Sequence, residues 1–120
     1  MEHHRRLIEY QQFLDETEIS EKRARELYLS FAENLSCLFA QMGEAVQQMD
    51  RDRVQQVLHA MAGLTDGYKV PVLHDEIVGM QMMLRSNHPL SSATFLNQKK
   101  QTEQINEQVL KEISHLTQKL

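Results

Sequence analysis

The chain has 120 residues, of which 41% are hydrophobic and 25% are charged, and its formal net charge at pH 7 is −4. This length predicts one domain with a single core, and the composition excludes an intrinsically disordered chain. The acidic balance argues against a nucleic-acid partner, because proteins that bind a phosphate backbone usually carry a basic excess.

The compartment is predicted from the N-terminus and from the cysteine content. The first ten residues, MEHHRRLIEY, are charged throughout, and no apolar run approaches the length of a membrane span. The single cysteine, Cys37, cannot form an intrachain disulfide, which fits a reducing compartment. We interpret Cys37 as a small core or boundary residue rather than a nucleophile. The sequence therefore predicts a soluble, cytoplasmic protein with no membrane partner.

Four glycines and two prolines favour long helices joined by few loops. The first predicted helix, Glu2 to Leu14, is short and its apolar pattern is irregular. We interpret His3 and His4 near its start as exposed polar residues. Residues 15–20 (DETEIS) are predicted to connect it to the next helix, with Ser20 as the N-cap.

A long amphipathic helix is predicted from Glu21 to Met49. Its apolar residues recur in steps of four and three, which is the seam of a helix that packs at shallow crossing angles. These residues are Ala24, Tyr28, Phe31, Leu35, Leu38, Met42, Ala45 and Met49.

The next helix, roughly residues 50–70, begins at Asp50 or Asp52 and ends before Pro71. Its large apolar residues have the spacing of one buried stripe. They are Val54, Val57, Leu58, Met61, Leu64 and Tyr68. At about 100° of rotation per residue, His59 lies on nearly the opposite side of the helix. Gly63 follows on this outward face, where glycine costs roughly 1 kcal/mol relative to alanine, which indicates that a partner approaches the backbone there.

Pro71 suits the first position of the following helix, residues 72–85. This helix is predicted to bury Leu73, Ile77, either Met80 or Gln81, and Leu84. The cluster of Met80, Met82 and Met83 fits either core filling or an adaptable binding surface. Residues 86–92 form the clearest loop, and the last helix runs from Ala93 to Leu120. Its apolar stripe contains Phe95, Ile105, Val109, Ile113, Leu116 and Leu120.

This order of elements predicts an all-α fold, an up-and-down four-helix bundle with an additional N-terminal helix. The single domain covers residues 1–120. Residues 1–19 form the N-terminal helix and connection, residues 20–85 form the core with the His59 helix, and residues 93–120 form the C-terminal helix.

Several kinds of site are absent from the sequence. There is no glycine-rich phosphate loop, and one cysteine cannot supply a zinc finger. Glu112 and His115 form one Glu-x-x-His pair, but a carboxylate di-iron site needs a second copy, so we interpret the pair as solvated. His74 and His88 receive no role. We therefore expect no metal site.

One segment carries a family resemblance. The stretch HAMAGLTDGYKV that begins at His59, together with the preceding MDRDRVQQVL, resembles the histidine phosphotransfer (HPt) domain of multistep phosphorelays. The family pattern has an apolar residue two positions after the histidine, a glycine four positions after it, and small or hydroxyl residues beyond. Met61, Gly63 and Thr65 match this pattern, and the resemblance covers roughly residues 26–84.

The resemblance implies an HPt-like bundle in which His59 exchanges a phosphoryl group with receiver-domain aspartates of response regulators or a hybrid histidine kinase. It implies a phosphoryl carrier without independent catalytic activity or a cofactor of its own, because the receiver supplies the phosphorylated aspartate and Mg²⁺. We expect the docking surface to include Gln55, Ala62, Gly63 and Asp66.

Two positions depart from the family pattern and keep an alternative open. Ala62 stands where the family has a cation, and Leu64 stands where serine is common. A phosphoryl group on His59 would then lack a charge-assisted hydrogen bond worth about 1.5–3 kcal/mol, unless Lys69 or Arg53 replaces it. The alternative is a degenerate HPt fold that serves as a helical adaptor or chaperone in a regulatory or secretion system, without phosphotransfer.

Overall fold

Five helices and no strand make up residues 6–118, which is the part of the chain that the computed structural model describes. They are α1 (Tyr10–Thr17), α2 (Glu21–Gln47), α3 (Arg51–Gly67), α4 (Pro71–Arg85) and α5 (Ala93–Thr117). The predicted all-helical class is confirmed for these residues. The predictions for His3, His4 and Leu120 fall outside the described residues.

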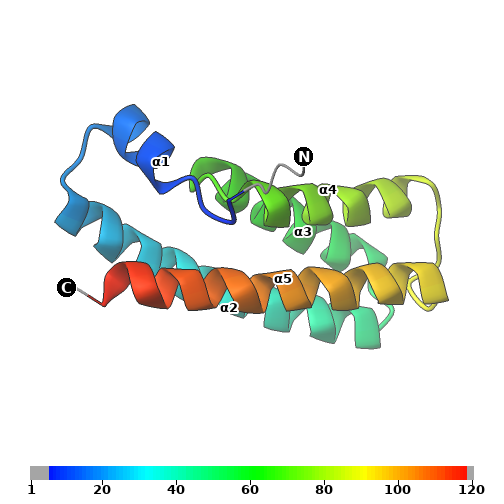
Figure 1. The fold of residues 1–120 in the computed structure, drawn as a ribbon. Helices are drawn as coiled ribbons and strands as arrows, with labels where there is room; N and C mark the ends of the chain where they lie inside the picture. Colours follow the sequence, from blue (N-terminus) through cyan, green and yellow to red (C-terminus); the bar gives the residue numbers. More distant parts are fainter. Residues whose placement is uncertain (1–5, 119–120) are drawn as a thin grey trace, which may run out of the picture.

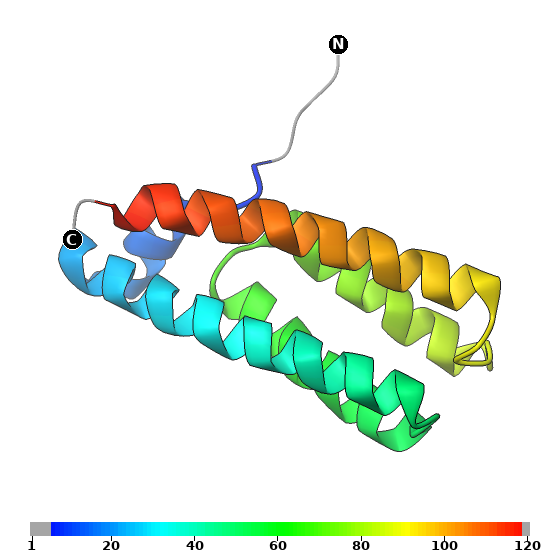
Figure 2. The same cartoon turned by 90° about the horizontal axis from the view of Figure 1, so that it is seen from below.

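The four long helices form a bundle. Helix α2 packs on α3 and α5, and α4 packs on α3 and α5, so the four close into a ring around a common core. Consecutive helices run in opposite directions, and the short α1 lies at the end of the bundle where α2 begins and α5 ends (Figures 1 and 2). None of the helices in residues 6–118 is long and apolar enough to cross a membrane.

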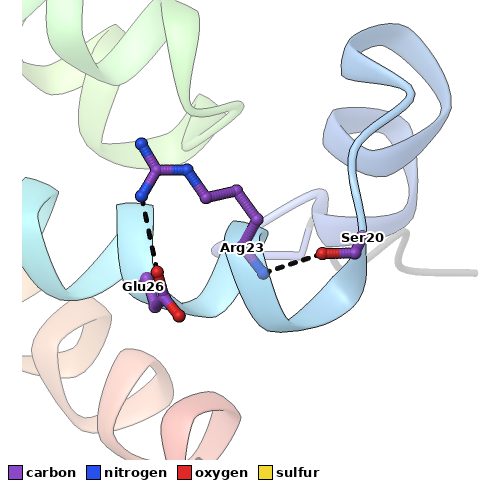
Figure 3. A network of polar contacts seen from close by, with 3 residues as sticks. All are labelled: Ser20, Arg23 and Glu26. Atoms are coloured by element: carbon purple, nitrogen blue, oxygen red, sulfur yellow. Dashed lines mark hydrogen bonds and ion pairs between the residues drawn. The ribbon is translucent and has the colours of Figure 1, made fainter.

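Three of the helices begin at a side chain that accepts a hydrogen bond from the backbone of the first turn. The predicted cap Ser20 accepts from the Arg23 N–H at 3.1 Å, and Figure 3 shows this bond beside the Arg23–Glu26 ion pair. Asp50, one of two residues predicted to cap the next helix, accepts from the Arg53 N–H at 3.1 Å. Ser92 caps α5. These caps stabilise the helix starts because the first N–H groups have no partner within the helix.

The predicted seam of α2 is confirmed except at Leu38 and Met49, and the predicted Met42 and Ala45 in its second half are fully buried. Phe39 is buried in place of Leu38, which is half-buried, and Val46 is buried at the end of the helix. At 3.6 residues per turn, the positions three and four after Leu35 both lie near the seam, and the helix buries the second of them. Cys37 is exposed, so its prediction as a core or boundary residue is wrong.

Met49 does not belong to α2, contrary to the prediction. The helix ends at Gln47, and Met49 takes a left-handed conformation with φ of 55° and is 56% exposed. The N–H groups of Met49 and Asp50 bond back to the carbonyl oxygens of Val46 and Ala45 at 3.1 and 2.9 Å. This is how a helix closes its last turn when the chain reverses direction.

We expect Met49→Gly to raise the free energy of unfolding by about 0.5–1 kcal/mol, measured by urea denaturation. The left-handed conformation costs a side-chain-bearing residue roughly 1–2 kcal/mol, and glycine avoids most of this cost at some expense in chain entropy. Met49→Ala is the matched control, because it removes the exposed side chain but keeps the strain. An equal gain from both variants would contradict the role assigned to the backbone.

Helix α1 differs most from its prediction, since it begins at Tyr10 and continues to Thr17. The N–H of Glu9 donates to the carbonyl oxygen of Lys69 at 2.8 Å, so the chain before α1 bonds to the α3–α4 turn instead of extending the helix. Phe13 of α1 is buried and its ring stacks on that of Tyr68, with centroids 5.3 Å apart. Long-range contacts of this kind have no signal in a local pattern.

The same aromatic cluster buries a hydroxyl. Tyr28 is fully buried, and its hydroxyl donates to the carbonyl oxygen of Tyr68 at 2.6 Å. Burial is the main reason why the pKa of Tyr28 is raised, and the neighbouring Tyr10 and Tyr68 add to the shift. Tyr68, predicted as the last residue of the buried stripe, is half-buried and lies directly after α3.

The stripes of α4 and α5 are largely as predicted. In α4, Met80 rather than Gln81 is buried, and Met82 is 58% exposed. In α5 the predicted Ile105 and Leu116 are half-buried, whereas Thr102 and Asn106 are buried in the middle of the helix. Polar residues therefore complete the core where the predicted stripe had few apolar residues.

Candidate functional site

Helix α3 presents His59 to solvent from a firmly packed position. The stripe on its opposite face is buried as predicted at Val54, Val57, Leu58 and Met61, while Leu64 is half-buried. Thr65 is also buried, and its hydroxyl donates to the Met61 carbonyl oxygen at 2.9 Å, so the polar side chain is satisfied within the helix. The predicted exposure of His59 is confirmed.

His59 lines a pocket of about 260 Å³ between α3 and α4. The other residues that line it are Gln55, Gln81, Leu84 and Arg85. The side chains of these residues include two amides, an imidazole and a guanidinium, and no lining residue carries a carboxylate. In a chain of net charge −4 this is a local excess of hydrogen-bond donors and positive charge, which suits an anionic group.

The polar groups of the pocket are free to bind such a group. Within residues 6–118, neither His59 nor Arg85 forms a hydrogen bond or an ion pair with another side chain or with the backbone. An arginine that no carboxylate neutralises retains its full charge and all five N–H donors for a ligand. We define these five residues as the His59 pocket.

Gln81 and Arg85 were missed by the sequence analysis, which looked for a cation close to His59 in the chain. The two residues it considered are engaged elsewhere. The Lys69 ammonium lies 3.0 Å from the Glu16 carboxylate, and the Arg53 guanidinium lies 3.7 Å from that of Glu44. Neither lines the His59 pocket. The signal that could have been used is the position of Gln81 and Arg85, one turn apart, on the flank of the α4 stripe.

The four predicted docking residues are brought together only in part. Gln55 lines the His59 pocket. Gly63 is exposed, and a Cβ added there would meet nothing within 4 Å, so packing inside the chain does not require glycine at this position. Ala62 is half-buried against α4, and Asp66 lies at a different pocket near the α3–α4 turn.

That second pocket belongs to His74. Its Nδ1 lies 3.1 Å from the Ala62 carbonyl oxygen and 3.1 Å from the Thr65 hydroxyl oxygen. The Thr65 hydroxyl already donates within its own helix, so both neighbours accept, and the arrangement favours a proton on Nδ1. The pocket is also lined by three acidic residues, Glu9, Asp66 and Asp75, and by Lys69, whose ammonium is paired with Glu16, so the acidic excess disfavours an anion. We interpret His74 as a link that holds α4 on α3.

The remaining candidates carry no site. Glu112 and His115 are exposed, as expected for a solvated pair. In the described part of the chain, no three His, Cys, Asp or Glu side chains come together as metal ligands. Comparisons of this chain with known protein families, with curated proteins and with solved structures find no match.

Proposed function

We propose that this protein is a histidine-containing phosphotransfer protein with an HPt-like arrangement, in which His59 exchanges a phosphoryl group with receiver-domain aspartates of a multistep phosphorelay. The observation that carries the proposal is the His59 pocket. An exposed imidazole without a polar partner lies there beside an unpaired guanidinium, on a rigid helix and away from carboxylates. Exposure allows a partner domain to reach the nucleophile, and the rigid helix holds it in one orientation.

The chemistry needs little from the carrier itself. A lone pair on a neutral imidazole nitrogen attacks the phosphorus of an aspartyl phosphate, so that a P–N bond forms while the P–O bond to the carboxyl group breaks. The electron pair of the broken bond returns to the aspartate as its carboxylate, and the imidazolium proton passes to solvent. The receiver domain supplies Mg²⁺ for this step, as is usual where positioning and charge stabilisation dominate phosphoryl transfer.

Arg85 takes the role for which the family uses a cation beside the histidine. Arg85 lines the pocket from α4 and carries a guanidinium, whereas Ala62 of α3 offers no charge. Gln55 and Gln81 add amide donors for phosphoryl oxygens. The open space over Gly63 supports the same proposal, because a receiver loop can approach the helix backbone there.

The experiment that tests the proposal is phosphoryl transfer to the full chain. The purified protein is incubated with a panel of phosphorylated receiver domains and, separately, with potassium phosphoramidate, a small donor that needs no partner surface. We expect a label that is labile in acid and stable in alkali, as for a phosphoramidate bond, and that maps to His59. A chain that takes no label from any receiver or from phosphoramidate would contradict the proposal.

Arg85→Gln tests the contribution of the guanidinium. We expect it to lower the equilibrium ratio of phosphorylated His59 to phosphorylated receiver by about tenfold or more, because a charge-assisted hydrogen bond is lost. The ratio is measured by separating the two labelled proteins after equilibration. Arg53→Gln is the matched control, since this arginine pairs with Glu44 on the surface. Equal ratios for the two variants would show that Arg85 does not contact the phosphoryl group.

The adaptor function remains a second candidate, and the exposure of Met82 on α4 favours it. A flexible, polarisable side chain in solvent is typical of surfaces that bind varied partners. An adaptor would take no label in the same assay. A partner of an adaptor, found by co-purification, would bind the His59→Gln variant as tightly as the native chain. A partner in a phosphorelay would no longer exchange a phosphoryl group with that variant.

A further inference from the structure

Arg51 joins the start of α3 to the end of α4. Its guanidinium is half-buried and donates from Nη2 to the carbonyl oxygen of Leu84 at 2.6 Å and from Nη1 to that of His88 at 2.8 Å. These acceptors lie 33 and 37 positions further along the chain. One side chain therefore fixes both the last turn of α4 and the loop that follows it.

The loop is also closed on the same turn by His88. The His88 N–H donates to the Met83 carbonyl oxygen at 3.0 Å, and the ring Nδ1 lies 3.2 Å from the same oxygen. The Asn87 N–H donates to the Leu84 carbonyl oxygen at 3.1 Å. These bonds close the turn locally, whereas Arg51 ties it to another helix.

The turn that Arg51 holds is the one that lines the His59 pocket. Leu84 lines the pocket, its carbonyl oxygen accepts from Arg51, and Arg85 follows directly in the chain. At the other end of the helix pair, His74 contacts the Ala62 carbonyl oxygen. The His59 pocket thus lies between two polar links that set how far α4 is shifted and rotated along α3.

We infer that Arg51 is a positioning residue for phosphoryl transfer: by donating hydrogen bonds to two carbonyl groups at the end of α4, it holds Arg85 in the His59 pocket. The inference rests on the proposed function. It explains how a cation from α4 is held near His59 although the α3 motif has none. Arg51 does not line the pocket, so it acts through α4 and not on the phosphoryl group.

Arg51→Lys separates position from charge. Lysine keeps the positive charge, but its single ammonium cannot reproduce the planar fork that bonds two carbonyl groups at once. We expect Arg51→Lys to lower the equilibrium ratio of phosphorylated His59 to phosphorylated receiver by about tenfold, close to the effect of Arg85→Gln. The matched control is Arg53→Lys, which makes the same change two positions away at a surface ion pair and should leave the ratio unchanged.

The double variant shows whether the two arginines act through one route. If Arg51 works by placing Arg85, then Arg51→Lys/Arg85→Gln should lose no more than Arg85→Gln alone, because residues that share one interaction are not additive. The inference would be overturned if the two single losses in the equilibrium ratio multiplied in the double variant. It would also be overturned if Arg51→Lys kept the native ratio. Circular dichroism of each variant establishes that the compared proteins are folded.

Nuclear magnetic resonance decides the same inference without phosphoryl transfer. In the native protein without a phosphoryl group, the Arg51 guanidinium should give separate, slowly exchanging N–H signals, because two of its nitrogens donate hydrogen bonds to carbonyl groups. Rapid averaging of these signals would overturn the inference, even if the Arg51→Lys protein fails to fold. In a folded Arg51→Lys protein, the Arg85 Nε–H signal should shift, and in Arg53→Lys it should not. An unchanged Arg85 signal would also overturn it. A native chain that takes no label but shows these signals would refute the proposed function and leave the positioning geometry intact.

Discussion

His59→Gln is expected to abolish acid-labile labelling of the protein while the free energy of unfolding stays within about 0.5 kcal/mol of the native value. Glutamine is a poor nucleophile at phosphorus, so no P–N bond forms. The side chain it replaces is exposed and forms no polar contact within residues 6–118, so the fold loses nothing with it. Label transfer and urea denaturation measure the two parts of this result.

His115→Gln provides the control, because His115 is an exposed histidine on α5 outside the His59 pocket. It should label like the native chain. Label that persists in His59→Gln would move the acceptor to another histidine, with His74 and His88 the next to be replaced. Unfolding of His59→Gln would contradict the position of His59 outside the core.

Leu58→Ala, one residue away, should have the opposite consequences. Leu58 is fully buried, and truncating a buried leucine costs about 2–5 kcal/mol through lost transfer free energy and the cavity left behind. We expect a loss of this size in the free energy of unfolding, measured by urea denaturation followed by circular dichroism. Under conditions where the variant remains folded, it should still accept label, because His59 is unchanged.

The matched control is Leu29→Ala, since Leu29 is 41% exposed on α2. The same chemical change there should cost far less, because little apolar surface leaves the protein interior. Equal losses from the two substitutions would contradict the packing of α3. Together, His59→Gln and Leu58→Ala test whether the exposed face of α3 serves phosphoryl transfer and its buried face stabilises the fold.

The local sequence pattern predicted the helix caps and the buried face of α3 well. Ser20 as a cap and the stripe Val54, Val57, Leu58 and Met61 were predicted correctly, because capping and helical periodicity depend on neighbouring residues. The error at Leu38 arose because the positions three and four after Leu35 both lie near the seam, so spacing alone does not choose between Leu38 and Phe39. Cys37 was assigned from the usual burial of free cysteine and not from its place on the helix. The error at Met49 arose because the closure of α2 depends on a left-handed residue that is not glycine.

The candidate site divides in the same way. His59 and the open face around Gly63 were found in the sequence, because both follow from rotation along one helix. Lys69 and Arg53 are the cations that sequence proximity indicated, but they are paired with carboxylates of α1 and α2. Arg85 was not considered, because it comes from a different helix.

Helical periodicity was enough to predict which side of α3 is buried and that His59 is exposed, since the rotation per residue of a helix depends only on its backbone geometry. The presence of Arg85 and Gln81 in the pocket beside His59 depends instead on how α4 packs on α3. The side chains that meet across two helices depend on their relative shift and rotation. In this protein, contacts between distant residues set that register, among them the bonds from Arg51 to the carbonyl groups of Leu84 and His88.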